Sequence, residues 1–175
     1  FPQIKLPNKF FKNSGNASFV DLSNAIDGDS ATYSNGAVYA DFDNDGDLDV
    51  VVNNIDEEAL LYKNNINDSS KYSSVEVKLQ GPLQNINSTG AKVMVFAGGS
   101  IRMYEKYPVR GFMSSMEIPL HIGLANTRLD SALLIWPDNS YEKLQIPPGA
   151  SRLTVTYKKG LQKFDYKSFT GNCKN

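Results

Sequence analysis

The sequence predicts an all-β protein. Apolar side chains fall in short runs or alternate with polar ones, and the spacing of an amphipathic helix is hard to find. Asn, Gly, Asp and Pro interrupt these runs often, which is typical of short strands joined by tight turns. Residues 75–79 and 153–157 alternate strictly, as strands with one packed and one wet face do.

Each expected strand is an apolar or alternating run bounded by turn residues. In chain order, the runs lie at 9–12, 37–40, 50–53, 60–63, 74–79, 92–97, 101–107, 120–123, 132–136, 142–146 and 152–157.

Composition predicts an N-terminal and a C-terminal domain. Residues 64–74 are dominated by Asn, Asp, Ser and Lys, so we place the boundary near residue 67. This gives an acidic N-terminal domain over 1–66 and a sandwich-like domain over 67–158. A polar tail or linker is expected over 159–175.

The bulk numbers narrow the classes of partner. Eighteen basic and nineteen acidic side chains give a net charge of -1, which disfavours nucleic acid. No stretch reaches the roughly 18 consecutive apolar residues of a transmembrane segment. The single cysteine, Cys173, excludes an internal disulfide. Because the chain begins at Phe1, we expect it to be a piece of a longer protein.

The strongest chemical signal is the acidic stretch at residues 41–49, which lies between two expected strands. Its carboxylates would repel one another if they converged without a counter-charge, and a divalent cation relieves that repulsion. Calcium fits best, because it accepts six to eight oxygens in a flexible shell. Magnesium is the weaker alternative, and a solvated acidic turn without metal is the remaining one. The expected ligands are the carboxylates of Asp41, Asp43, Asp45 and Asp49 and the backbone carbonyl of Asp47.

The rest of the loop is expected to support the ion. Gly46 permits a sharp turn through positive φ. Phe42 and Leu48 are expected to pack beneath the loop, and the side chains of Asn44 and Asp47 to face solvent. The loop begins like an EF-hand, but the Glu at the twelfth position of that motif is replaced by Val52.

The N-terminal third is similar to a known repeat. Residues 8–13, 19–23, 36–53 and 60–64 resemble the end of an FG-GAP or VCBS repeat and the start of the next one. Such repeats form the blades of integrin-like β-propellers, and their aspartate loop binds calcium. The resemblance implies a partial propeller blade whose neighbouring blades, in the same polypeptide, are missing from this chain.

The C-terminal part resembles the ASPIC and UnbV domain through residues 90–95, 120–124 and 133–138. That domain follows FG-GAP repeats in the cartilage acidic protein family and in bacterial surface proteins. Asn139 and Ala125 stand where the family usually has Gly, so two turns can differ in shape. The implied architecture is a blade fragment with a calcium loop, packed on or linked to a β-sandwich-like domain.

Catalytic patterns are weak. His121 is the only histidine, and no Gly-x-Ser-x-Gly string occurs. We interpret His121 as a hydrogen-bonded strand residue rather than a catalytic base. A basic and aromatic run could instead line a carbohydrate- or protein-binding face, with exposed strand residues as the simpler explanation. This run comprises Arg102, Tyr104, Lys106, Tyr107 and Arg110.

These observations favour a non-catalytic, calcium-binding module that recognises a protein or glycan outside the cell. Its expected location is extracellular or at the cell surface, either secreted or on a bacterial outer membrane. The alternative is an accessory domain of a carbohydrate-active enzyme, a hydrolase or lyase, with chemistry in absent domains or around His121 and Arg110.

Overall fold

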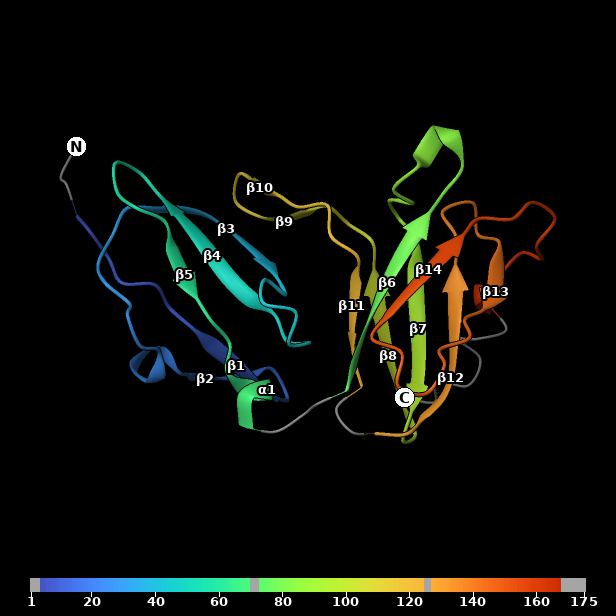
Figure 1. Ribbon diagram of the computed structural model, residues 1–175, viewed down its shortest axis with the longest axis horizontal. Helices are drawn as coiled ribbons and strands as arrows, with labels where there is room; N and C mark the ends of the chain where they lie inside the picture. The colour runs from blue at the N-terminus through green and yellow to red at the C-terminus, as the bar shows by residue number, and fades with distance from the viewer. Residues whose placement is uncertain (1–3, 70–72, 125–126, 168–175) are drawn as a thin grey trace. The chain divides into compact units, whose positions relative to one another are not determined.

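A computed structural model describes residues 4–69, 73–124 and 127–167. Short strands dominate these residues (Figure 1), so the all-β prediction is confirmed. The helical elements are α1 (Ile66–Ser69) and the 3-10 turns η1 (Ser23–Ala25) and η2 (Leu83–Asn85). Among the described residues, no helix has both the length and the apolar character needed to cross a membrane.

The described residues divide into two compact units. Those up to Asn65, together with Val109–Met116, form unit 1. Those in Ile66–Pro108, and those from Glu117 onward, form unit 2. The chain therefore leaves unit 2 after Pro108 and returns to it at Glu117.

Unit 1 is built on a three-stranded antiparallel sheet. Strand β4 (Asp49–Asn54) lies between β3 (Ser34–Ala40) and β5 (Leu60–Tyr62). β-branched valines fill the middle of β4, as suits the central strand of a sheet. Two hairpins complete the unit: β1 (Phe11–Gly15) with β2 (Ser18–Asp21), and β9 (Val109–Gly111) with β10 (Ser114–Ser115).

Unit 2 consists of two sheets. One has the order β11-β6-β14 and is mixed, because β14 runs parallel to β6 while β11 runs antiparallel to it. The other is antiparallel with the order β13-β12-β7-β8. The strands are β6 (Ser74–Gln80), β7 (Lys92–Ala97), β8 (Ser100–Glu105), β11 (Leu120–Gly123), β12 (Leu129–Ile135), β13 (Tyr141–Lys143) and β14 (Arg152–Thr156).

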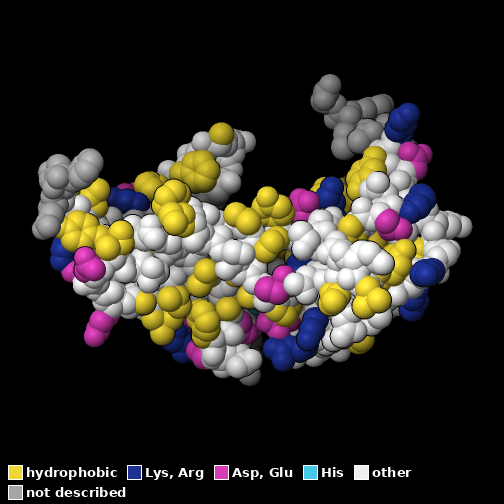
Figure 2. Space-filling model, turned by 90° about the horizontal axis from the view of Figure 1, so that it is seen from above, with side chains coloured by type: hydrophobic (Ala, Val, Ile, Leu, Met, Phe, Trp, Pro, Cys, Tyr) yellow, Lys and Arg dark blue, Asp and Glu magenta, His cyan; other side chains and the backbone are white. Residues whose placement is uncertain are grey.

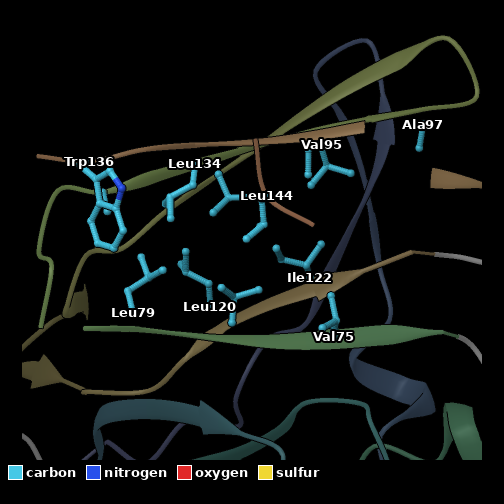
Figure 3. Packing of buried hydrophobic residues seen from close by; sticks show 13 residues of the cluster. Val75, Leu79, Val95, Ala97, Leu120, Ile122, Leu134, Trp136 and Leu144 are labelled. Carbon is cyan, nitrogen blue, oxygen red and sulfur yellow. The ribbon is translucent and has the colours of Figure 1, made fainter. Parts of the chain in front are cut away.

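The core of unit 2 lies between these sheets. In Figure 3 the labelled side chains of both sheets point into the space between them. Val75 and Ile122 come from one sheet, Val95 and Leu134 from the other, and all four are fully buried. Trp136 closes one end of the cluster, with its indole N–H donating to Glu142 at 3.0 Å. Burial of this apolar surface is the main force that holds unit 2 together.

Residues just beyond β14 also belong to the fold of unit 2, in the stretch expected to be a tail or linker. Tyr141 donates its N–H to the carbonyl of Gln162 at 2.9 Å, and Phe164 donates to Asn139 at 2.8 Å. The rings of Tyr141 and Phe164 pack edge to face at 5.5 Å. This stretch therefore extends the pairing around β13.

Candidate metal centre

The acidic loop joins β3 to β4, the position expected for it. Ala40 pairs with Asp49, so the loop is closed at its base by the last rung of the β3–β4 ladder. Asn44 and Gly46 have φ values of 61° and 93°, which bend the chain sharply twice within three residues. Gly46 thus adopts the positive φ expected of it, a conformation that glycine tolerates best.

Backbone N–H groups inside the loop point at the carboxylates. Asp45 donates its N–H to Asp41 Oδ1 at 3.1 Å and to Asp43 Oδ1 at 3.3 Å, and Gly46 donates to Asp41 Oδ2 at 3.0 Å. Asp47 donates to Asp45 Oδ1 at 3.0 Å. These local bonds, typical of Asx turns, hold the carboxylates in place.

Three of the expected ligands come together. One carboxylate oxygen from each of Asp41, Asp43 and Asp45 lies within 4.8 Å of the others. Calcium binds oxygen at about 2.3–2.6 Å, so two ligands on opposite sides of one ion lie about 5 Å apart at most. Asp43 is exposed, whereas Asp41 and Asp45 are half-buried. The spacing of the three carboxylates is therefore compatible with a single metal ion of calcium's size.

The remaining acidic residues of the loop are buried beside this cluster. Asp49 is 3% exposed, and its carboxylate accepts N–H bonds from Phe42 at 3.1 Å and from Asn64 at 2.9 Å. It lies outside the three-residue cluster and braces the loop ends. The side chain of Asp47 was expected in solvent but is 6% exposed, and Phe42, expected to be packed, is 51% exposed. The loop thus turns Asp47 inward and Phe42 outward.

Two residues that the sequence analysis did not assign to the site come from the end of β5. The ammonium of Lys63 lies 2.9 Å from Asp43 Oδ2, and Asn64 Nδ2 donates to the carbonyl of Leu48 at 3.4 Å. The signal was present, because the aromatic-Lys-Asn triplet ending at Asn64 also ends at Asn13. A repeated triplet beside each repeat boundary indicates a shared structural role.

Lys63 also favours the ionised form of Asp43. Its hydrogen bond and its positive charge hold the pKa of the Asp43 carboxyl below the usual range, and the N–H of Asp45 adds to this. This keeps the carboxylate ionised further into acid, and a metal ligand must be ionised. The lysine also offsets part of the repulsion within the cluster.

The basic and aromatic run does not form one exposed face. Arg102 and Tyr104 turn towards the core side of β8, where both side chains donate to the carbonyl of Gly123, at 2.7 and 3.4 Å. Lys106 is buried. Tyr107 and Arg110 are exposed. A ligand-binding role for these residues stays a prediction.

His121 lies on β11 opposite Glu76 of β6. It is half-buried, and its Nδ1 makes no hydrogen bond within the described part of the chain. The strand position expected of His121 is thus found, and the expected hydrogen bond is not made by Nδ1.

Comparison with known families matches two separate stretches of the chain. The family described as FG-GAP-like repeat matches residues 6–52, which include the whole acidic loop. The family described as ASPIC and UnbV matches residues 81–162. The chain contains an FG-GAP-like repeat followed by an ASPIC/UnbV domain. No curated protein matches it.

The two families place the site in context. FG-GAP-like repeats generally bind Ca²⁺ in their loops and are typically extracellular. The acidic loop of this chain lies within the matched repeat, and its three converging carboxylates could hold such an ion. The pair of domains indicates an extracellular-type repeat module.

Proposed function

We propose that this chain is a non-catalytic, calcium-stabilised module of a larger protein, which recognises a protein or a glycan outside the cell or at its surface. The observation that carries the proposal is the convergence of Asp41, Asp43 and Asp45 in the FG-GAP-like repeat. Extracellular modules work with calcium sites as weak as about 10⁻⁴ to 10⁻³ M, so a partly exposed loop is sufficient.

Calcium would act here as a structural link. The side chains of Asp41, Asp43 and Asp45 would hold it, with Asp49 and the Asp47 carbonyl as the further expected ligands. When bound, the ion neutralises the clustered carboxylates. The N–H groups of the loop position these carboxylates, and Asp49 fastens the loop to Asn64 behind it. Binding would thus stabilise the junction of β3, β4 and the end of β5.

Calcium titration tests the metal assignment. We expect calcium to raise the melting temperature of the repeat and a chelator to lower it, because an ion that binds only the folded state adds about 2.7 kcal/mol at 100 times its Kd. Asp45→Asn should abolish the calcium heat in calorimetry. Asp56→Asn, in the exposed turn after β4, is the matched control and should bind like the native chain. Equal melting with calcium and with chelator would contradict the proposal.

The surface of unit 1 supports the proposal that further propeller blades of the same polypeptide cover it. Figure 2 shows hydrophobic side chains on the surface of this unit. Phe11 and Phe19 are 59% and 60% exposed on the β1–β2 hairpin, although an isolated hairpin is marginally stable in water. Neighbouring repeats would bury these rings, because exposed apolar patches mark protein contacts.

A binding role and a catalytic role make different predictions for the intact chain. We expect binding on a glycan array, or to a cell-surface protein, without turnover of hydrolase or lyase substrates. The exposed Tyr107 of unit 2 and the exposed Arg110 of unit 1 are separate candidate contacts, and replacing the one that binds with Ala should weaken that binding. Turnover by the purified chain that is lost in His121→Ala would replace the binding assignment with the enzyme alternative.

A further inference from the structure

A short hairpin in unit 1 comes from a distant part of the sequence. Strands β9 and β10 lie in the segment matched by the ASPIC/UnbV family, yet Val109–Met116 belongs to unit 1. Figure 1 shows this hairpin beside β3. We call residues 109–116 the arm. The segment of the ASPIC/UnbV match thus supplies a piece of the unit that contains the FG-GAP-like repeat.

The base of the arm is closed within unit 2 by an ion pair whose lysine is buried. Lys106, just before the arm, is 7% exposed, and its ammonium donates to the carboxylate of Glu117 and to the carbonyl of Ile118, just after it. The backbone of Lys106 is also held, by bonds of 2.8 Å with Gly90 and Ala91. A buried lysine is tolerated only when it is paired, so this contact fixes where the arm begins and ends.

The end of the arm is held on the edge of the sheet by one hydroxyl. Ser114 Oγ accepts the N–H of Ala37, on the edge strand β3, at 3.1 Å and donates to the carbonyl of Phe112 at 2.9 Å. Ser114 is 9% exposed, so both bonds are shielded from water. Edge strands expose N–H groups that invite pairing with other chains, and Ser114 covers one of them.

Because Gly36 has no side chain, the arm can pack directly against β3 at this position. A Cβ at this position would lie 2.5 Å from Ser114 Oγ and 3.2 Å from the carbonyl oxygen of Phe112. The φ of Gly36 is not in the left-handed region, so its backbone does not require glycine. The requirement is steric, because any larger side chain would push the arm away from β3.

We propose that the arm acts as a clasp, a segment that holds and covers the β3 edge of the FG-GAP-like repeat. Ser114 holds it through the hydrogen bond from Ala37, and Gly36 leaves the space in which it lies. The partner it fits is the β3 edge of the same chain. The clasp covers that edge, so the β3–β4–β5 sheet ends there instead of pairing with another strand. Residues 109–116 of the ASPIC/UnbV match thus contribute to the edge of the repeat's sheet, which goes beyond the calcium-dependent role proposed above.

Amide hydrogen exchange at Ala37, read by NMR, tests the hydrogen bond to Ser114. We expect Ser114→Ala to speed exchange of this amide roughly five- to tenfold, since one hydrogen bond is lost. The neighbouring Ser115 is exposed, so Ser115→Ala is the matched control and should leave the rate unchanged. Exchange at Val51, in the central strand, reports whether the sheet remains folded.

A double-mutant cycle tests the steric requirement for glycine at position 36. Gly36→Ala should also speed exchange at Ala37, whereas Gly123→Ala should not, because a Cβ there meets nothing within 4 Å. If the methyl group added by Gly36→Ala acts by displacing Ser114 Oγ, the double variant exchanges no faster than Ser114→Ala alone. Independent, multiplying effects, or an unchanged rate in Ser114→Ala with Val51 still protected, would overturn the clasp. None of these outcomes depends on calcium, so the proposal fails or stands separately from the metal site.

Discussion

The two units bury their apolar residues very differently. In unit 2, thirteen buried side chains form one cluster between two sheets. In unit 1, Val52 is the only buried hydrophobic residue among those described, while large apolar side chains such as Ile4, Phe11 and Phe112 are exposed. Unit 2 therefore has the core of an independent domain, and unit 1 lacks one.

Polar contacts hold unit 1 where a core is missing. Tyr62 of β5 donates its hydroxyl to Asp29 Oδ1 at 2.6 Å and accepts a bond from Asn8 at 2.9 Å. Phe10 packs edge to face on the Tyr62 ring at 5.1 Å. These contacts fasten the N-terminal segment to the sheet. The comparison teaches that unit 1 is held by hydrogen bonds and a ring contact where unit 2 has a buried apolar core.

Truncating a core side chain in each unit should have the largest effect on the free energy of unfolding. It tests whether the two units are stabilised separately. Leu134→Ala should cost about 2–5 kcal/mol, because Leu134 is fully buried. Val52→Ala should cost about 1–2 kcal/mol and act on unit 1 alone. Trp136, the single tryptophan, lies in unit 2, so its fluorescence during urea unfolding reports that unit. Hydrogen exchange of the β4 amides reports unit 1.

The control for Leu134→Ala is Leu83→Ala, since Leu83 is 87% exposed and its loss should barely change unfolding. We expect Val52→Ala to leave the Trp136 transition in place and to speed exchange in β4. If Val52→Ala moved the Trp136 transition as far as the β4 protection, the units would unfold as one. The comparison between two separately stabilised units would then be wrong.

Strands with a buried face could be predicted from the sequence, and most of the exposed short strands could not. The strict alternation of β6 and β14 marks both, because each has one face in the core. Strands β2, β9 and β10 were missed, since most of their residues are exposed and carry no such pattern. The β9–β10 hairpin depends on contacts with β3, some 75 residues earlier, which local patterns cannot encode.

Only the residues of the acidic loop itself could be predicted as part of the candidate site. The spacing of Asp41, Asp43 and Asp45 placed three carboxylates on one side of a tight loop, as found. Lys63 and Asn64 reach the loop through the pairing of β5 with β4, so only the sheet brings them there. The burial of the Asp47 side chain depends on how the loop folds, which residue spacing does not reveal.

The smallest expected effect is the pH dependence of the stability of unit 2, which arises at the turn that contains Asp138. At the turn after β12, Asp138 accepts bonds from the Ser140 hydroxyl at 2.6 Å, the Ser140 N–H at 2.9 Å and the Lys163 ammonium at 3.0 Å. These donors, with the Tyr157 hydroxyl, hold the pKa of Asp138 well below its usual range. The stabilisation is therefore present above the unfolded pKa of about 4 and is lost as pH falls below it.

Asp138→Asn should accordingly lower the melting temperature of unit 2 slightly at neutral pH, and the difference from the native chain should vanish in acid. The effect is small because Asp138 and Lys163 are both solvent-exposed, where ion pairs contribute little. Asp130→Asn, at an exposed position of β12, is the control and should melt like the native chain at every pH. A difference for Asp138→Asn that persisted unchanged into acid would mean that packing of the turn, rather than the charge of Asp138, supports this end of the core.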